Sequence, residues 1–452
     1  MSILVFLALV IVVLLGLALL YQIGDPEQTT PPRELLTANP QGFVFGEYRR
    51  LGQKPQFFYR DEQVDGHILI VGGTGSGKSS GLAIPSLQAW RQRIFAIDIM
   101  GELSKATAHK PGQQRVFNPM EVDAWGYDPF YLLRQTDSPV QAALELAMSI
   151  IPEVSGHTDP IWAHSPQQLL TAFILHHFLE GLSFVETIDR ILKIPVETHI
   201  TTIAEYTTVP AVQYYITPFV GYVGKDSKML PSFFNEISRQ TLLFVTDDNV
   251  KASLSKENVI TPDDLENGID IYLSIPMYLL DQWRPLTRLM VNQFLKHFER
   301  RERYNPIPIL FLLDELPRLG KIEPVVTGLT TLRSRKITIA LIVQSLAQFD
   351  LIYGEEQRIN IFDNCDYQAI LRARDAKAQR VFSEMVGTHE VKRVGSSTSY
   401  DNNNEQRGYT TSESSGKECI MEPHEFAKLK EDLVLLSPWG YHRAEKIRPI
   451  VS

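Results

Sequence analysis

The stretch "LIVGGTGSGKSSG", residues 69–81, constrains the fold more than any other part of this 452-residue chain. It contains the spacing Gly72-x-x-x-x-Gly77-Lys78-Ser79, which is the pattern of a phosphate-binding loop. The apolar run "HILIV" before it predicts a strand, and "SSGLAIPSLQAW" after it predicts a helix. A strand, a glycine-rich loop and a helix in this order predict a parallel α/β unit that binds a nucleotide.

Each residue type in this loop has a chemical role in holding phosphate. Glycines let the backbone curl so that successive N–H groups point toward phosphate oxygens. Lys78 places a positive charge near the β- and γ-phosphates, and the Ser79 hydroxyl can join the coordination shell of Mg²⁺. We therefore predict ATP and Mg²⁺ as cofactors. The predicted nucleotide-binding residues are Gly72, Gly73, Thr74, Gly75, Ser76, Gly77, Lys78, Ser79 and Ser80.

An acidic pair follows the apolar run in "ILFLLDELPRLG", residues 309–320. Asp314, at the predicted strand end, can hold Mg²⁺ through water, so Ser79 and Asp314 are the predicted metal-site residues. Glu315 can orient and deprotonate the attacking water. A glutamate directly after the magnesium-binding aspartate favours ATP hydrolysis by a motor-type enzyme. An acidic turn that caps the next element is the alternative interpretation.

Further polar residues end other predicted strands. Gln344 follows "ITIALIV" and can sense the γ-phosphate, and Asp98 ends another apolar run, because parallel strands place their site at their carboxyl ends. Hydrolysis also needs positive charge on the transition state. In "TTLRSRKIT", Arg333, Arg335 or Lys336 could be an arginine finger that reaches a neighbouring subunit, while a solvated helix end is the alternative.

The rest of the chain divides by its hydrophobic pattern. Strand-like runs predict the sheet, and helical spacing dominates residues 139–254, which predicts an inserted all-α domain. Residues 21–45 are predicted to be a linker, and the polar stretch 395–417 a flexible surface loop. The predicted parts are a membrane anchor (1–22), a linker and entry to the nucleotide-binding domain (23–60), the first part of that domain (61–135), the all-α insertion (136–262) and the second part (263–452).

Residues 3–20, "ILVFLALVIVVLLGLALL", contain no charged or polar side chain and are long enough to cross a bilayer. No basic residue precedes the run, as a cleaved signal peptide would require, so we predict a retained single-pass anchor. The nearest basic residues follow the run, which predicts that the main body faces the cytoplasm. They are Arg33, Arg49, Arg50 and Lys54.

Net charge and cysteine content exclude some classes of protein. The net charge of -9 excludes a basic field over the whole surface, although a basic groove or ring lining is compatible with it. Neither a disulfide framework nor a metal site can be read from only two cysteines, Cys365 and Cys419, and such a low content fits a reducing compartment.

Several motifs in sequence order resemble the coupling proteins of type IV secretion and conjugation, the TraG/TraD family. They are "GGTGSGKSS", "IDIMGEL", "IYLSIP", "LLDELPRLG", "QSLAQFDLIYG" and "EPHEFAKL". The resemblance implies a RecA-like, hexameric ATPase in the bacterial inner membrane. It would pass relaxase–DNA complexes or protein effectors to a type IV secretion channel, with DNA possible in the ring channel.

The resemblance also assigns residue roles. Lys78, Glu315, Gln344 and Arg333 match catalytic positions of the family, and the position of Arg333, eleven residues before Gln344, favours it over Arg335 as the finger. Two departures stand out. Met100 occupies a position where the family usually has lysine, and one membrane run is found where the family usually has two.

Other functions stay open at this point. A membrane-anchored DNA translocase outside secretion is one alternative, although a separate DNA-reading module is not seen. A docking platform that uses nucleotide only for assembly is another, and Glu315 argues against it. No guanine-specific N-K-x-D run is present, which disfavours a GTPase. The sequence leaves the cargo, DNA, protein or both, undetermined.

Overall fold

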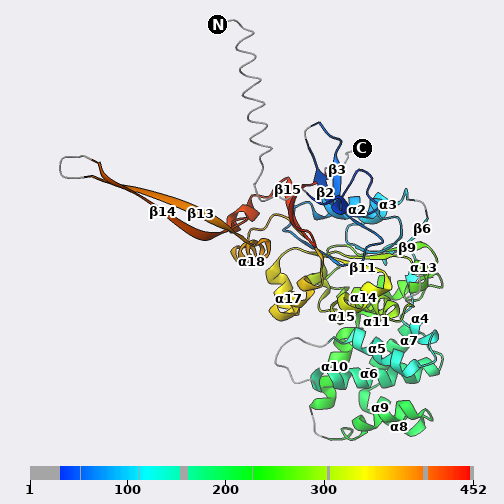
Figure 1. Cartoon of the computed structure of the whole chain (residues 1–452). Helices are drawn as coiled ribbons and strands as arrows, with labels where there is room; N and C mark the ends of the chain where they lie inside the picture. Colours follow the sequence, from blue (N-terminus) through cyan, green and yellow to red (C-terminus); the bar gives the residue numbers. More distant parts are fainter. Residues whose placement is uncertain are drawn as a thin grey trace.

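A computed structural model describes residues 31–50, 52–110, 112–152, 161–225, 228–302, 306–400 and 406–447. Figure 1 shows a large mixed α/β body, a group of helices at one end of it and a long hairpin that projects from its side. The body is built on one sheet with the strand order β1-β3-β2-β16-β15-β12-β4-β11-β10-β5-β9-β6.

The central part of this sheet is parallel, as the apolar runs predict. In spatial order its strands are β12 (Tyr367–Ile370), β4 (Ile68–Val71), β11 (Ile337–Val343), β10 (Ile309–Leu313), β5 (Arg93–Asp98), β9 (Ile269–Ser274) and β6 (Gln113–Phe117). Every residue of β4, β10 and β11 is buried, because helices cover both faces of the sheet. Their carboxyl ends therefore lie together at one edge.

Antiparallel strands extend the sheet beyond β12. They are β15 (Asp432–Ser437), β16 (Gly440–Glu445), β2 (Gly42–Tyr48), β3 (Gln56–Asp61) and the short β1 (Leu36–Thr37). The prediction of a linker over 21–45 is therefore wrong for the part that enters β1 and β2. Phe43 and Phe45 are fully buried there. The Pro- and Thr-rich residues before them suggested a linker, although the residues that follow form a strand of the core.

The segment between β7 (Gly126–Tyr127) and β8 (Val259–Ile260) is helical, and these two strands pair in parallel where the chain enters and leaves it. We call α5–α12 the helical segment. Its helices are α5 (Pro139–Ile150), α6 (Ile161–Leu179), α7 (Phe184–Lys193), α8 (Val196–Tyr206), α9 (Pro210–Val220), α10 (Met229–Thr241), α11 (Leu243–Thr246) and α12 (Asp248–Ser253). One continuous apolar core joins it to the sheet through α14 (Arg284–Glu299).

Short helices connect and cover the strands. They are η1 (Arg33–Leu35), the π-helix η2 (Ser79–Ala83), α2 (Ile84–Ala89), α3 (Glu102–Thr107), α4 (Tyr131–Arg134), α13 (Pro262–Glu266), η3 (Leu316–Leu319), α15 (Glu323–Thr331), η4 (Arg333–Arg335), α16 (Leu346–Tyr353), α17 (Glu355–Asp363), α18 (Ala376–Val386) and η5 (Pro423–Ala427).

The polar stretch predicted as a flexible loop is instead a long β-hairpin. Strands β13 (Thr388–Tyr400) and β14 (Gln406–Cys419) pair antiparallel and project from the body (Figure 1). Serine, glycine and asparagine suggested a loop, yet β-branched residues such as Val391, Val394 and Thr411 favour an extended backbone. The loop prediction rested on the polarity of the stretch and did not consider the preference of these residues for strands.

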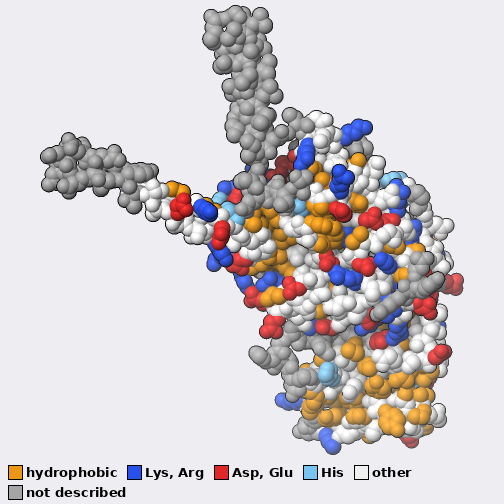
Figure 2. Space-filling model, in the orientation of Figure 1, with side chains coloured by type: hydrophobic (Ala, Val, Ile, Leu, Met, Phe, Trp, Pro, Cys, Tyr) orange, Lys and Arg blue, Asp and Glu red, His pale blue; other side chains and the backbone are white. Residues whose placement is uncertain are grey.

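The predicted membrane anchor, residues 3–20, lies outside the described residues. Among the residues that the structure describes, no helix combines the length and apolar character needed to cross a bilayer. Figure 2 shows acidic and basic side chains interspersed on one face of the body. Apolar side chains gather at the end of the helical segment, where Tyr206 and Tyr214 are 72% and 82% exposed.

Candidate nucleotide-binding site

The phosphate-binding loop lies at the carboxyl edge of the sheet, between the end of β4 at Val71 and the start of η2 at Ser79. Gly75 and Gly77 have φ angles of 69° and 89°, which side chains other than glycine rarely adopt. Ser79 is half-buried at the first turn of the helix, and Ser80 is exposed beside it.

Gly72 is required by close packing rather than by its backbone angle. A Cβ atom at Gly72 would lie 2.7 Å from the Cβ of Leu371 and 2.7 Å from Oγ of Ser76. The N–H of Gly72 donates to the carbonyl of Val343 (3.1 Å), and the N–H of Gly73 to that of Arg372 (3.3 Å). These bonds fix the loop between the ends of β11 and β12.

Lys78 is held inside the loop that it serves. Its ammonium donates to the carbonyl oxygens of Gly72 (2.7 Å) and Gly73 (3.3 Å), and the residue is 8% exposed. Burial lowers the pKa of Lys78, while the negative charges of Glu315 and Asp314 oppose that shift. An anion in the loop would stabilise this partly desolvated charge.

The acidic pair stands two strands away, at the end of β10. Glu315 has φ of 53°, a left-handed conformation that its N–H stabilises by donating to Oδ1 of Asp314 (2.9 Å). Burial, with the neighbouring charge of Glu315, raises the pKa of Asp314 to about 6. Two carboxyl groups in this position favour a bound cation, because a cation offsets both the burial of the Asp314 carboxylate and its repulsion by Glu315.

Gln344, at the end of β11, connects the loop and the acidic pair. Its Nε2 donates to Oε1 of Glu315, and its Oε1 accepts a hydrogen bond from Oγ1 of Thr74 (3.3 Å). The structure thus brings Lys78, Asp314, Glu315 and Gln344 together at one edge of the sheet. Their order follows from the parallel arrangement of β4, β11 and β10.

Arg333 does not belong to this cluster within the same chain. It lies in η4, directly before β11, and so stands at the amino edge of the sheet. The seven-residue strand β11 separates it from Gln344 by roughly 20 Å. Its guanidinium forms an ion pair with Asp366, which precedes β12, and its side chain is 44% exposed. Arg335, in the same turn, is half-buried.

Asp98 has a local role at its strand end. It is 1% exposed, and its carboxylate accepts hydrogen bonds from the N–H of Leu103 (3.1 Å) and the N–H and hydroxyl of Ser104 (2.9 and 2.7 Å). These bonds fix the first turn of α3. Met100, the departure from the family pattern, is exposed nearby.

The structure also places three residues that the sequence motifs missed beside the loop. Lys446 follows β16, and its Cδ lies 3.7 Å from the position of a Cβ atom at Gly77. Similarly, a Cβ atom at Gly81 would lie 3.5 Å from the carbonyl oxygen of Ile447. Arg372 holds Gly73 through its backbone. The contacts of Lys446 and Ile447 depend on the antiparallel strands β15 and β16, and that of Arg372 depends on the pairing of β12 with β4. No spacing in the sequence signals such distant pairings.

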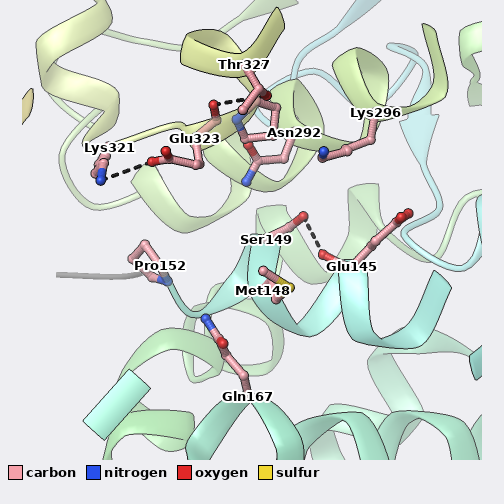
Figure 3. Close-up of a pocket in the computed structure, with 11 residues that line it drawn as sticks. Glu145, Met148, Ser149, Pro152, Gln167, Asn292, Lys296, Lys321, Glu323 and Thr327 are labelled. Atoms are coloured by element: carbon pink, nitrogen blue, oxygen red, sulfur yellow. Dashed lines mark hydrogen bonds and ion pairs between the residues drawn. The ribbon is translucent and has the colours of Figure 1, made fainter. Parts of the chain in front are cut away.

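A cavity of about 140 Å³ lies elsewhere, where the helical segment meets α14 and α15 (Figure 3). Its lining combines apolar surface, to which Met148 and Pro152 contribute, with charged side chains, and Lys321 pairs with Glu323 at 3.0 Å on one side. The buried Oδ1 of Asn292 has no hydrogen-bond partner among the described residues. No residue of the phosphate-binding loop lines this cavity, which separates it from the nucleotide site.

Comparison with known proteins gives a consistent result. The family model described as "Type IV secretory system Conjugative DNA transfer" matches residues 26–444. The protein VirD4 of Agrobacterium fabrum (strain C58 / ATCC 33970) is 27% identical over 371 residues, which are 79% of this chain and 52% of that protein. The conjugal transfer protein TraG of Escherichia coli is 25% identical over 365 residues, 74% of this chain and 57% of that protein. This chain thus spans little more than half the length of these relatives.

Solved structures share the fold. The conjugative coupling protein TrwBdeltaN70 aligns with a TM-score of 0.66 at 18% identity, over 84% of each chain. TrwB in complex with ADP and Mg²⁺ aligns with a TM-score of 0.65 at 19% identity, over 84% of this chain and 85% of that one. The predicted α/β class with a parallel nucleotide-binding sheet is confirmed at the level of the fold.

Proposed function

Since the chain belongs to the type IV secretory system conjugative DNA transfer family, we propose that it is a motor ATPase that couples DNA–relaxase or protein substrates to a type IV secretion channel. The observation that carries the proposal is the convergence of Lys78, Asp314, Glu315 and Gln344 at one sheet edge. A protein that bound nucleotide only to assemble, without hydrolysing it, would not need Glu315 to be held by the amide of Gln344.

The residues at this edge fit ATP and Mg²⁺. The Oγ of Ser76 is buried beside Gly72 without a hydrogen-bond partner among the described residues, so the loop retains unused donor capacity. TrwB has been solved with ADP and Mg²⁺ and with an ATP analogue, which supports the same ligands for this chain. Residues 72–80 would hold the phosphates, with Ser79 and Asp314 at the metal. Bound Mg²⁺ would supply neutralisation of phosphate charge.

Glu315 and Gln344 would act on the attacking water. The hydrogen bond from Nε2 of Gln344 fixes the carboxylate of Glu315, which in turn can orient a water molecule and accept its proton. Because Oε1 of Gln344 accepts a hydrogen bond from Thr74 in the phosphate-binding loop, the same side chain can respond to the binding of phosphate in that loop. This pairing supports the roles of base and γ-phosphate sensor.

Arg333 would act on the site of a neighbouring subunit. It stands at the amino edge, roughly 20 Å from its own Gln344, and is 44% exposed, so it can reach phosphate only across a subunit contact. A ring in which one subunit's amino edge meets the next subunit's carboxyl edge satisfies this geometry. The resemblance to the family gives six as the number of subunits. Asp366 would position the finger between turnovers.

The predicted anchor completes the proposal. Residues 3–20 would hold the protein in the bacterial inner membrane by a single pass, with the body in the cytoplasm, where ATP is available. The partners would be a relaxase–DNA complex or protein effectors, and components of the secretion channel. The helical segment would belong to an all-α insertion of residues 136–262, placed between the two parts of the nucleotide-binding domain, residues 61–135 and 263–452.

Complementation in cells tests this function. A strain that lacks the gene is supplied with the parent chain, with Lys78→Ala or with Glu315→Gln, and the transfer of DNA or secretion of protein is counted. We expect both variants to reduce transfer at least 100-fold at equal protein level, because each removes a group that acts on the phosphates or the water. Normal transfer by either variant would favour a docking platform without translocation.

A further inference from the structure

A cluster of histidines lies in the helical segment, far along the chain from the nucleotide site. His176 and His177 are in the last turn of α6, and Glu180 follows that helix. The Nε2 of His176 is 3.5 Å from Oε1 of Glu180, and the Nδ1 of His177 is 2.9 Å from Oε2. Ligand atoms of these three side chains all lie within 4.8 Å of one another.

We propose that His176, His177 and Glu180 bind a divalent transition-metal ion of the zinc class. Zinc accepts imidazole nitrogen and carboxylate oxygen at about 2.0–2.2 Å, so neighbouring ligand atoms of a tetrahedral site lie about 3.3 Å apart. The separation of 3.5 Å between Nε2 of His176 and Oε1 of Glu180 is close to that value, and because all the ligand atoms lie within 4.8 Å of one another, side-chain movements alone could close the site. Mg²⁺ and Ca²⁺, which prefer oxygen ligands, fit it poorly.

The surroundings of His177 resemble the support that metal-bound histidines receive. Its second nitrogen, Nε2, is 2.9 Å from Nε2 of His199 on α8, and both residues are buried. The ring of His199 stacks on Phe173, with ring centroids 4.5 Å apart, and is thereby fixed. A hydrogen bond at the second nitrogen fixes the orientation of a ligating imidazole. The contact from α8 would therefore hold the imidazole of His177 in place for the ion at the end of α6.

Arg190, on α7, is the one described cation in direct contact with Glu180 and must be accommodated. It donates to Oε2 of Glu180 (3.2 Å), which leaves Oε1, the oxygen that faces His176, available to the metal. The side chain of Arg190 is 45% exposed, so water screens its repulsion of the ion. A ligating carboxylate commonly keeps such a second hydrogen bond.

A chain of hydrogen bonds without metal is the alternative account. It explains the short contact of His177 with Glu180, because Nδ1–H can donate to the carboxylate. It explains His176 less well, since the 3.5 Å contact between its Nε2 and Oε1 of Glu180 is an ion pair only when the imidazole is protonated. Three protein ligands would leave one coordination position for water or for a group from a partner.

Zinc binding to the purified full chain tests the proposal. The protein is stripped with EDTA, freed of nucleotide, and titrated with ZnCl₂ alone, with the bound metal counted by elemental analysis. We expect one tightly bound ion per chain. His176→Ala and Glu180→Gln should each weaken that binding at least 100-fold, and His199→Gln about 10- to 100-fold, because it acts through His177.

His109→Ala is the matched control, because it removes an exposed histidine outside the helical segment and should leave binding unchanged. Circular dichroism checks that each variant is folded. Should His176→Ala fail to fold, Glu180→Gln, whose side chain is 42% exposed in the parent, still decides the outcome. Absence of a bound ion in the parent, or equal affinity in the parent and a folded Glu180→Gln variant, would overturn the proposal. Neither result bears on ATP hydrolysis.

Discussion

Asp314 provides a test in which stability and nucleotide binding change in opposite directions. Its pKa is raised from 3.8 to about 6, first by burial and then by Glu315. Between these two values the folded protein binds more protons than the unfolded chain, so ionised Asp314 destabilises the nucleotide-free protein fully above pH 6. The shift corresponds to about 3 kcal/mol as an upper bound, since one pKa unit is 1.36 kcal/mol. Because the side chain keeps some contact with solvent, we expect about 1–2 kcal/mol.

Asp314→Asn should therefore stabilise the protein when ATP and Mg²⁺ are absent. At pH 7.5 we expect a thermal midpoint about 1–3 °C above that of the parent. The difference should shrink as the pH falls through 6 toward 4, where Asp314 of the folded parent is already protonated. When MgATP is added the order should reverse, because the variant has lost a predicted metal-site carboxylate.

Asp98→Asn is the control at the neighbouring strand end. Asp98 is also buried, but its carboxylate accepts three hydrogen bonds from Leu103 and Ser104. The substitution should lower stability by about 1–3 kcal/mol, since buried donors lose their acceptor. The reasoning would be refuted if Asp314→Asn lowered the midpoint at pH 7.5, or raised it equally at every pH.

Other substitutions test the loop and the finger. Gly72→Ala places a methyl group 2.7 Å from Leu371 and should abolish ATP binding in equilibrium dialysis, whereas Gly73→Ala, whose nearest contact is 3.7 Å, should bind at least tenfold better than Gly72→Ala. Arg333→Ala should keep ATP binding and self-association and lose most turnover, and mixing it with Lys78→Ala subunits should restore part of the activity. Failure of that mixture to regain activity would contradict a finger that acts between subunits.

The strands and the phosphate-binding loop were predictable because their signals are local. The apolar run before Gly72 and the run before Asp314 each extend over one strand, and burial on both faces leaves few alternatives for such sequences. The adjacency of Lys78, Glu315 and Gln344 also followed, since parallel strands align their carboxyl ends. The sequence could not order the strands. The position of β11 between β4 and β10, which puts Gln344 in contact with both partners, comes from the structure.

Features that depend on distant contacts were missed. The composition of residues 21–45 suggested a linker, because the strand partners of β2, namely β3 and β16, are needed to recognise the end of this stretch as part of the sheet. The hairpin of β13 and β14 was taken for a loop because serine and glycine outweighed its extended-strand residues. Lys446 lies beside the phosphate-binding loop because β16, which precedes it, belongs to the same sheet. It follows Lys78 by 368 positions in the sequence. No motif spans such a separation.

The histidine cluster illustrates the same limit. His176, His177 and Glu180 are close in sequence, yet the spacing matches no strong metal motif. His199 joins them only because α8 packs near the end of α6. The two cysteines of the chain give no indication of a zinc site either. The contact of His199 with the cluster depends on how the helices pack, which the spacing of histidines in the sequence does not predict.

The measurement that most directly tests the central claim is single-turnover ATP hydrolysis by the purified full chain and its Glu315→Gln variant, with and without single-stranded DNA. We predict that the variant binds MgATP with affinity close to that of the parent and hydrolyses it at least 100-fold more slowly, because an amide in place of the carboxylate that Gln344 contacts can no longer accept a proton from water. Equal hydrolysis rates in the two proteins, or no hydrolysis by the parent under either condition, would contradict the account.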